Sequence, residues 1–230
     1  MSGLGTPRLH LRSATSTNDR ARALAEAGAP HGTLVTARAQ SAGRGRQGRK
    51  WAAPPGQALL LSLVLRDLHD HARLLPLAAG VAVAEVCGPE AKIKWPNDVL
   101  LPGGGKVAGI LAEGRPLEGW AVLGIGLNVA VQVEDLPPAL HGSAATLGRP
   151  VGAVEDTLRE LMDALERALA LDPQSLLEAL RERDALLGRQ ISWAAGHGRA
   201  VGIDGAGRLL VRLEEGRTAT LDAGEVHLEV

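Results

Sequence analysis

The spacing of apolar residues changes at Gly188, and this change limits the folds open to the chain. Before Gly188, compact apolar runs typical of strands alternate with segments whose apolar residues repeat at helical spacing. After Gly188, short alternating apolar stretches are separated by turn residues, a pattern typical of a small β-barrel. We therefore predict an α+β domain over residues 1–187 and a barrel over residues 188–230.

The periodicity also predicts the individual elements. Strands are predicted over residues 9–14, 34–38, 58–65, 91–95, 106–113 and 120–129, and helices over residues 19–27, 72–87, 154–171 and 174–186. In the second unit, alternating apolar residues predict four strands around residues 191–193, 201–203, 209–213 and 226–230.

Positive and negative charges nearly balance over the whole chain, but positive charge is concentrated in one segment. The formal net charge is −1, and no acidic residue lies between Glu26 and Asp67. Within that gap, residues 43–51 hold four cations and three glycines. A nearly neutral chain with one basic segment argues against a protein that coats nucleic acid, and for one that binds a small anionic ligand at one place.

The basic segment has the residue types of an anion-binding loop. Glycine lets the backbone approach a ligand closely, and guanidinium groups offer paired donors that match phosphate or carboxylate oxygens. Residues 43–48 also satisfy the dinucleotide pattern GxGxxG, but that pattern must open a helix, and here Pro54 and Pro55 follow. A solvated surface loop is the alternative explanation for such a segment.

Three further motifs combine glycine or proline with residue types that are rare in this chain. They are residues 94–98 (Lys-Trp-Pro-Asn-Asp), residues 106–110 (Lys-Val-Ala-Gly-Ile) and residues 124–128 (Gly-Ile-Gly-Leu-Asn). The first places a carboxylate and an amide at the rim of a sheet, where ligands often bind. Each motif alone is also typical of a tight turn or a close strand crossing.

Together and in this order, the motifs resemble the catalytic part of biotin protein ligases. The resemblance covers roughly residues 13–130 and begins with Ser16, Thr17, Asn18 and Gln40. It implies a mixed β-sheet flanked by helices, as in class II synthetases, followed by a small SH3-like barrel. It also implies an ATP-dependent ligase that forms biotinyl-AMP and transfers biotin to a lysine of a carboxyl carrier protein. Some members carry an N-terminal helix-turn-helix, which this chain is expected to lack, so no DNA binding is expected.

The resemblance implies three groups of site residues. Catalytic roles fall to Arg46, Lys106 and Asp98, with Asp98 orienting the acceptor amine. Biotin is expected to contact Ser16, Thr17, Asn18, Gln40, Arg44, Gly45, Arg46, Trp51, Lys106, Gly109, Gly124 and Gly126. ATP and the adenylate are expected to contact Arg44, Arg46, Arg49, Trp51, Asn97, Lys106 and Asn128. Mg²⁺ is expected with ATP, and no metal ligand is assigned.

Two alternatives stay open from sequence. A lipoate protein ligase would share the fold and the adenylation chemistry, and a noncatalytic RNA-binding module would also use a basic loop. Because the chain has four Trp and no Phe or Tyr, it offers a poor platform for stacking bases.

The remaining expectations concern location and assembly. Cys87 is the single cysteine, which excludes an internal disulfide, and it lies in an apolar run typical of a buried thiol. No apolar stretch approaches the ~20 residues of a membrane span, so a cytoplasmic protein is expected. A homodimer through the apolar strands near residues 107–129 and a monomer both stay open. The basic segment is expected to be disordered when the site is empty and to fold over the adenylate when the site is full.

Overall fold

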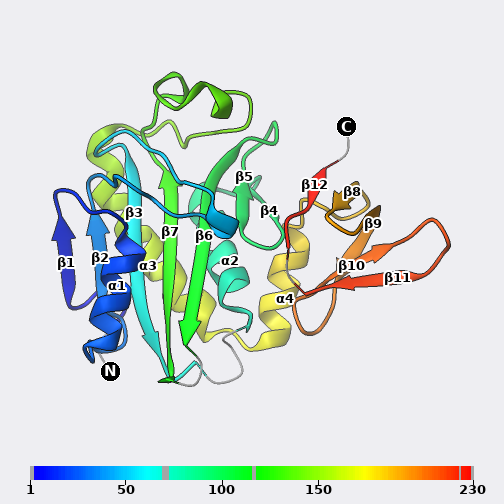
Figure 1. Cartoon of the computed structure of the whole chain (residues 1–230), viewed down its shortest axis with the longest axis horizontal. Coiled ribbons are helices and arrows are strands. Elements are labelled where there is room, and N and C mark those ends of the chain that lie inside the picture. Colours follow the sequence, from blue (N-terminus) through cyan, green and yellow to red (C-terminus); the bar gives the residue numbers. More distant parts are fainter. Residues whose placement is uncertain (1–2, 69–72, 116–117, 223, 229–230) are drawn as a thin grey trace.

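The computed structural model describes residues 3–68, 73–115, 118–222 and 224–228. In this part of the chain, one large sheet and one small sheet lie side by side (Figure 1). The large sheet has seven strands in the order β1-β2-β3-β7-β6-β5-β4, and the small one has five in the order β11-β10-β9-β8-β12.

The large sheet is mixed. Its first two strands, β1 and β2, are parallel, and all the other neighbours are antiparallel. The strands are β1 (Arg8–Leu11), β2 (Leu34–Ala37), β3 (Ala58–Arg66), β4 (Lys92–Lys94), β5 (Asp98–Leu100), β6 (Lys106–Arg115) and β7 (Trp120–Asn128). The mixed sheet expected from the resemblance is therefore confirmed. Strand β7 is paired on both sides, whereas β6 is paired with the short β5 only between Lys106 and Gly109, so a dimer through these strands stays a prediction.

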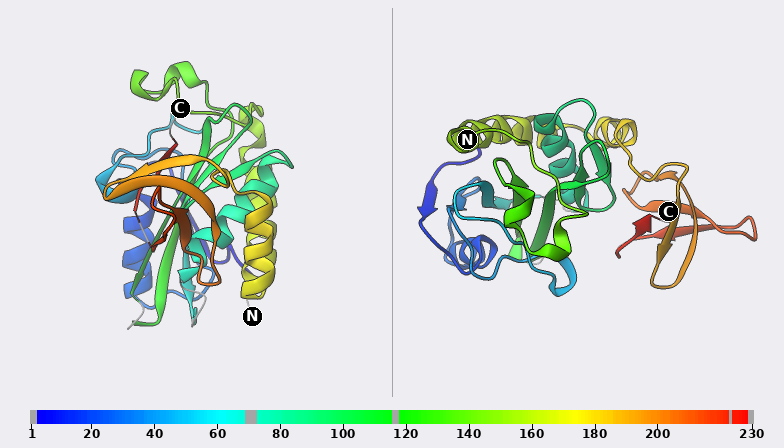
Figure 2. Two further views of the ribbon diagram at one scale, coloured as in Figure 1. Left: turned by 90° about the vertical axis from the view of Figure 1, so that its right-hand side faces the viewer. Right: turned by 90° about the horizontal axis from the view of Figure 1, so that it is seen from above.

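Helices cover the two faces of this sheet unequally. Helix α1 (Thr17–Glu26) packs on β2, β3 and β7 from one side, whereas α2 (Leu75–Cys87), α3 (Val154–Ala170) and α4 (Pro173–Glu182) lie on the other (Figure 2). Since α1 is one short helix, part of the sheet face on which it packs stays open for a ligand.

Alternation along β3 and β7 assigns their side chains to the two faces. In β3, Leu59, Leu61, Leu63 and Leu65 join the large core under α2 and α3, while Val64 packs under α1. In β7, Trp120 and Val122 pack under α1, and the next residues on the same face are Gly124, Gly126 and Asn128. The α1 face of β7 therefore changes from large apolar residues to glycines where α1 begins.

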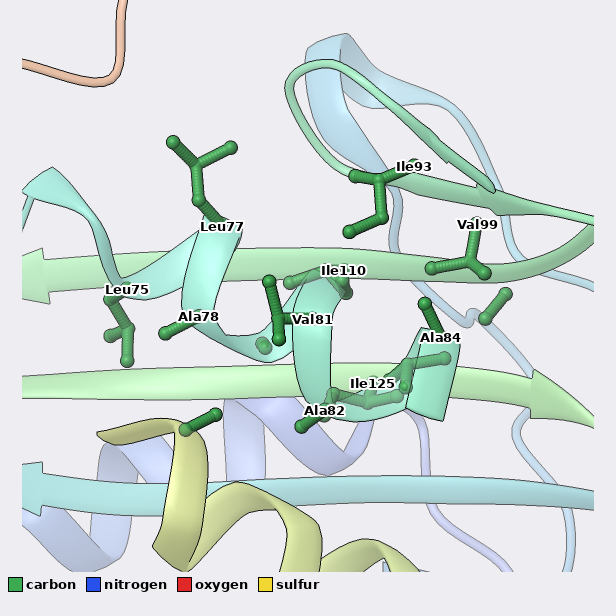
Figure 3. Packing of buried hydrophobic residues seen from close by; sticks show 14 of the residues in the cluster. Leu75, Leu77, Ala78, Val81, Ala82, Ala84, Ile93, Val99, Ile110 and Ile125 are labelled. Carbon is green, nitrogen blue, oxygen red and sulfur yellow. The ribbon is translucent and has the colours of Figure 1, made fainter. Parts of the chain in front are cut away.

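Helix α2 is buried nearly all round because it packs on the sheet and has α3 and α4 beside it. Its side chains contact strands β4 to β7 (Figure 3). Fully burying a side chain of this type stabilises the fold by about 1.5–3 kcal/mol. The labelled residues of this packing are Leu75, Leu77, Ala78, Val81, Ala82, Ala84, Ile93, Val99, Ile110 and Ile125.

The small sheet contains β8 (Gln190–Trp193), β9 (Gly196–Ile203), β10 (Leu209–Arg212), β11 (Thr218–Leu221) and β12 (His227–Leu228). Its antiparallel strands confirm the predicted all-β texture, but closure into a barrel stays a prediction. The turn between β9 and β10 contacts the larger part, because Trp95 Nε1 donates a hydrogen bond to Gly207 O at 2.9 Å.

The predicted elements agree with the structure in their order but differ in several bounds. The first strand ends at Leu11, three residues early. The short strand β5 was not predicted, and β11 was missed because Thr218 and Thr220 give it little apolar alternation. Strand β9 begins at Gly196, five residues before the strand predicted around residues 201–203. The last helix ends at Glu182, four residues early, because Ile93 pairs with the segment at Asp184. Residue 72, where the second helix was predicted to begin, lies outside the described residues.

Candidate active site

A cavity of about 350 Å³ lies on the α1 face of the large sheet, at the end where the helix begins. It is bounded by the start of α1, the basic segment, β5 to β7 and the segment around residues 136–144. Every site residue predicted from sequence lines this cavity: Ser16, Thr17, Asn18, Gln40, Arg44, Gly45, Arg46, Arg49, Trp51, Asn97, Asp98, Lys106, Gly109, Gly124, Gly126 and Asn128. Their individual roles stay predictions.

Asn18 lies across three neighbouring strands. Its Oδ1 accepts a hydrogen bond from Ser62 Oγ at 2.6 Å, and its Nδ2 donates to Leu111 O at 3.3 Å. Ser62 and Leu111 are both in register with Gly124 of β7, which lies between them. A Cβ at position 124 would be 2.0 Å from Asn18 Oδ1, so only glycine fits below the amide. The amide is therefore held flat against the sheet.

Thr17 and Gln40 meet beside Asn18. Gln40 Oε1 accepts hydrogen bonds from Thr17 N at 2.6 Å and from Thr17 Oγ1 at 3.2 Å. Ala14 pairs in parallel with Gln40 and thereby continues the pairing of β1 with β2, which brings residues 16–18 next to Gln40. The result is a wall of fixed polar groups at one end of the cavity.

Trp51 packs over the next pair of glycines on this face of the sheet. A Cβ at Gly126 would be 2.4 Å from Trp51 Cε2, and one at Gly109 would be 3.1 Å from Trp51 Cζ3. Gly109 and Gly126 are directly paired between β6 and β7. Lys106 Nζ lies 5.7 Å from the centre of the indole ring, within the range of a cation–π interaction. Two glycines and a lysine thus fix a flat aromatic wall.

Charged groups gather near β5. Lys106 Nζ forms an ion pair with Asp98 Oδ1 at 2.7 Å, and Arg46 Nη1 donates to Asn97 Oδ1 at 3.2 Å. Burial lowers the pKa of the Arg46 guanidinium, although the nearby Asp98 charge raises it. Burial likewise lowers the pKa of Lys94, which lines the same cavity. These cations are partly desolvated, which strengthens their attraction for an anion.

The basic segment forms a short hairpin, which we call the basic hairpin (residues 43–51). Arg44 and Lys50 pair in antiparallel fashion, Gly45 N donates to Arg49 O at 2.7 Å, and Trp51 N donates to Gly43 O at 2.9 Å. A single 3₁₀ turn, η1 (Arg46–Gly48), forms its tip. No α-helix follows, as expected when the dinucleotide motif was rejected.

Carboxylates hold the basic hairpin on two sides. Arg44 pairs with Asp19 at 2.6 Å and with Glu113 at 2.9 Å. Burial lowers the pKa of Arg44, but the hydrogen bond from Asp19 and the charge of Glu113 outweigh burial, and the pKa is raised. On the other side, Arg49 pairs with Glu225 at 2.6 Å, which connects the hairpin to the C-terminal sheet. In this structure the charge of Arg44 is thus balanced by the protein itself.

Sequence reasoning missed several residues of this region. Ser62, Asp19 and Glu113 do not line the cavity themselves, but each of them forms a hydrogen bond with Asn18 or Arg44, which do line it. Leu136 and Leu140 also line the cavity, although they lie in a Pro-rich segment for which no strand or helix is predicted. Two isolated leucines in such a segment were the only available signal.

Comparison with known proteins points to the same part of the chain as the cavity. The profile of the Biotin/lipoate A/B protein ligase family matches residues 11–129, which include nearly all of the cavity. The chain belongs to this family. Within biotin/lipoate ligases, the profile of the biotin protein ligase C-terminal domain matches residues 187–228 and thus the small sheet.

Known members of this family are similar to the chain over most of their length. The biotin–(acetyl-CoA-carboxylase) ligase of Paracoccus denitrificans is 38% identical over 237 residues, covering 92% of this chain and 96% of its own. The enzyme of that name from Mycobacterium tuberculosis is 36% identical over 233 residues, covering 92% and 85%. The solved biotin protein ligase of Aquifex aeolicus in complex with biotin and ATP has a TM-score of 0.78 at 28% identity, covering 97% and 99%.

Two further findings concern the expectations on location and the thiol. Among the described residues, no helix is both long and apolar enough to cross a membrane. Burial raises the pKa of the Cys87 thiol to about 12, which fits a structural rather than a reactive cysteine.

Proposed function

We propose that this chain is a biotin protein ligase. It joins biotin to AMP from ATP and then transfers the biotinyl group to a lysine of a biotin carboxyl carrier protein domain in the cytoplasm. The observation that carries the proposal is one cavity of about 350 Å³ that combines a polar wall, an aromatic wall and partly desolvated cations, in a chain of this family. A cavity of this size suits a small organic ligand with a few fixed polar contacts.

Biotin is favoured over lipoate by the C-terminal part of the chain. The profile that matches residues 187–228 is that of biotin protein ligases, and the relatives at 36% and 38% identity carry biotin ligase names. The RNA-binding alternative is disfavoured because Trp95 and Trp120 are buried in the core and cannot stack on bases.

The first step needs charge compensation. A biotin carboxylate oxygen attacks the α-phosphorus of ATP, the bond from phosphorus to the bridging oxygen breaks, and pyrophosphate leaves. Two anions must therefore approach each other. Arg46 and Lys106 would supply the opposing charge, supported by their positions beside Asn97 and Asp98 at the cavity wall. Fixed positive groups of this kind lower the barrier most where water is excluded.

Mg²⁺ would enter with the ATP phosphates and neutralise part of their charge. The described residues contain no cluster of three or more His, Cys, Asp or Glu that could hold a metal by themselves. One oxygen does fit such an ion: Asn128 Oδ1 lines the cavity, is buried, and has no hydrogen-bond partner among the described residues, while Asn128 Nδ2 donates to Ala145 O. A free acceptor oxygen suits Mg²⁺, a water of its shell or a ribose hydroxyl, rather than a phosphate.

The second step breaks the anhydride. The lysine amine of the carrier attacks the biotinyl carbonyl, an amide bond forms, the bond from carbonyl carbon to phosphate oxygen breaks, and AMP leaves. The acceptor ammonium must lose a proton first. We assign orientation of this amine to Asp98, whose carboxylate lies at the cavity wall beside Lys106.

Isotope exchange between pyrophosphate and ATP tests the first step directly. We expect exchange that depends on biotin and is absent when lipoate replaces it. Exchange with lipoate alone would identify a lipoate ligase, and no exchange with either acid would contradict the proposal. Transfer to a carrier domain, with the same domain carrying arginine in place of its acceptor lysine as control, tests the second step.

A further inference from the structure

Glu113 joins three elements although it does not line the cavity. It lies on β6, two residues beyond Leu111 and on the same face of the strand, toward the start of α1. Its side chain is 23% exposed, and all its described partners come from α1 or the basic hairpin. The residue therefore stands between the polar wall of the cavity and the hairpin that borders it.

The two carboxylate oxygens have different partners. Glu113 Oε2 accepts from Asn18 Nδ2 at 2.9 Å. Glu113 Oε1 accepts from Arg22 Nη2 at 2.8 Å and from Arg44 Nη2 at 2.9 Å. A single carboxylate thus holds an amide of the cavity through one oxygen and the hairpin through the other.

The contact fixes which way the Asn18 amide faces. Glu113 Oε2 and Leu111 O are both acceptors, so they require the NH₂ side of the amide, and Ser62 Oγ then donates to Asn18 Oδ1. Both N–H groups of Asn18 are used inside the protein, and Oδ1 keeps one lone pair for a donor. Without the carboxylate, Leu111 O at 3.3 Å would be the one acceptor left for Asn18 Nδ2 among the described residues.

Asp19 provides an internal comparison. It pairs with Arg44 at 2.6 Å and with Arg22 at 3.5 Å, the same two guanidiniums that Glu113 holds. No hydrogen bond from Asp19 to Asn18 is found among the described residues. Two carboxylates therefore share the task of holding the hairpin, and Glu113 alone also contacts the cavity.

We propose that Glu113 is a positioning residue, which sets the Asn18 amide for the acid substrate and holds the basic hairpin beside it. The proposal rests on the biotin ligase function for its substrate. Because one side chain carries both contacts, the polar wall and the hairpin are ordered together before ligand arrives. Such preorganisation improves binding because less order has to be imposed when the ligand enters.

The test separates the two contacts with matched variants. Glu113→Gln keeps the size of the side chain but removes its charge, and Asp19→Asn removes only charge that faces the arginines. Each variant is assayed for tryptic cutting within residues 44–50 without ligand, for biotin affinity by calorimetry without ATP, and for its melting temperature. Both variants should be cut faster than the wild type, whereas only Glu113→Gln should bind biotin about tenfold more weakly.

A double-mutant cycle shows whether Glu113 acts through Asn18. In an Asn18→Ala background, Glu113→Gln should have no further effect on biotin affinity. An unchanged affinity in the Glu113→Gln single variant, an equal loss in Asp19→Asn, or a loss explained by a lower melting temperature would each overturn the proposal. The cutting assay needs no ligand, so it still tests the hairpin contact if the wild type fails to bind biotin and the ligase function is wrong.

Discussion

Gly124 lies directly below the amide of Asn18, so closely that a Cβ at position 124 would be 2.0 Å from Asn18 Oδ1. Three neighbouring strands contribute to this contact, because Ser62 and Leu111 flank Gly124 in register. The glycine motif of β7 is therefore explained by close approach of a side chain rather than by a turn.

Gly124→Ala should displace the Asn18 side chain and weaken biotin binding at least tenfold. Overpacking should also lower the free energy of unfolding by about 1–3 kcal/mol. Calorimetry and urea unfolding measure both effects. Gly152→Ala is the control, because a Cβ there meets no atom within 4 Å. Removing the obstruction with Asn18→Ala in the same chain should restore the stability, and a double variant as unstable as Gly124→Ala would contradict the stated cause.

Arg46→Gly should release the adenylate. Arg46 is partly buried at the cavity wall, and removing a charge-assisted contact should shorten the lifetime of bound biotinyl-AMP about tenfold or more. Biotin would then appear on the lysines of a bystander protein, detected with streptavidin. The exposed Arg217, which pairs with Glu215 in the small sheet, serves as the control through Arg217→Gly. Equal labelling by both variants would count against a role for Arg46 in retaining the adenylate.

Biotin and ATP together should protect the basic hairpin from trypsin. The segment holds four cleavable residues, and anions in the cavity would order it further. We expect cutting within residues 44–50 to slow markedly, while cutting at Arg217 stays constant. If the two sites respond alike, or if neither responds, the hairpin does not close over the ligand.

Arg183→Met should destabilise the fold by about 2 kcal/mol. Arg183 Nη1 donates to Gly88 O at 2.8 Å and to Ala91 O at 3.2 Å, so it caps the end of α2 from the end of α4. The control is Arg167→Met. This change breaks an exposed ion pair between Arg167 of α3 and Glu85 of α2 and should cost no more than about 1 kcal/mol. Urea unfolding compares the two, and equal losses would refute the capping role.

The Cys87 thiol should resist alkylation in the folded protein. Its pKa is raised to about 12 by burial, so the thiolate, which is the reactive form, is scarce at pH 8 and increases only as the pH approaches 12. Iodoacetamide at pH 8, followed by intact mass, should modify the native protein about a hundredfold more slowly than the urea-unfolded chain. Rapid modification of the native protein would show that the thiol is accessible.

Sequence patterns predicted most of the large sheet and the composition of the cavity. The continuous apolar run over residues 58–65 is typical of a buried strand, and all of its residues are buried. The motifs near Asn18, Trp51 and Lys106 do meet. Strand β11 was not predictable because Thr218 and Thr220 leave only weak alternation.

Contacts between distant segments could not be predicted. Glu113 lies in an ordinary strand, and nothing within its own segment indicates that Asn18 and Arg44 converge on it. Arg183 lies within a predicted helix, and nothing in that segment indicates that its guanidinium contacts the carbonyls at the end of α2. Such contacts depend on sheet register and helix packing, which local sequence does not encode.

The ion pair between Arg49 and Glu225 has a practical consequence for minimal versions of the protein. A version shortened at Gly188 would lose this anchor, and it would also lose Leu228, which forms part of the cavity wall. It would further expose Trp95, whose indole is now covered by the loop containing Gly207. The small sheet therefore completes the wall of the cavity through Leu228, and truncation there would leave the cavity open to water.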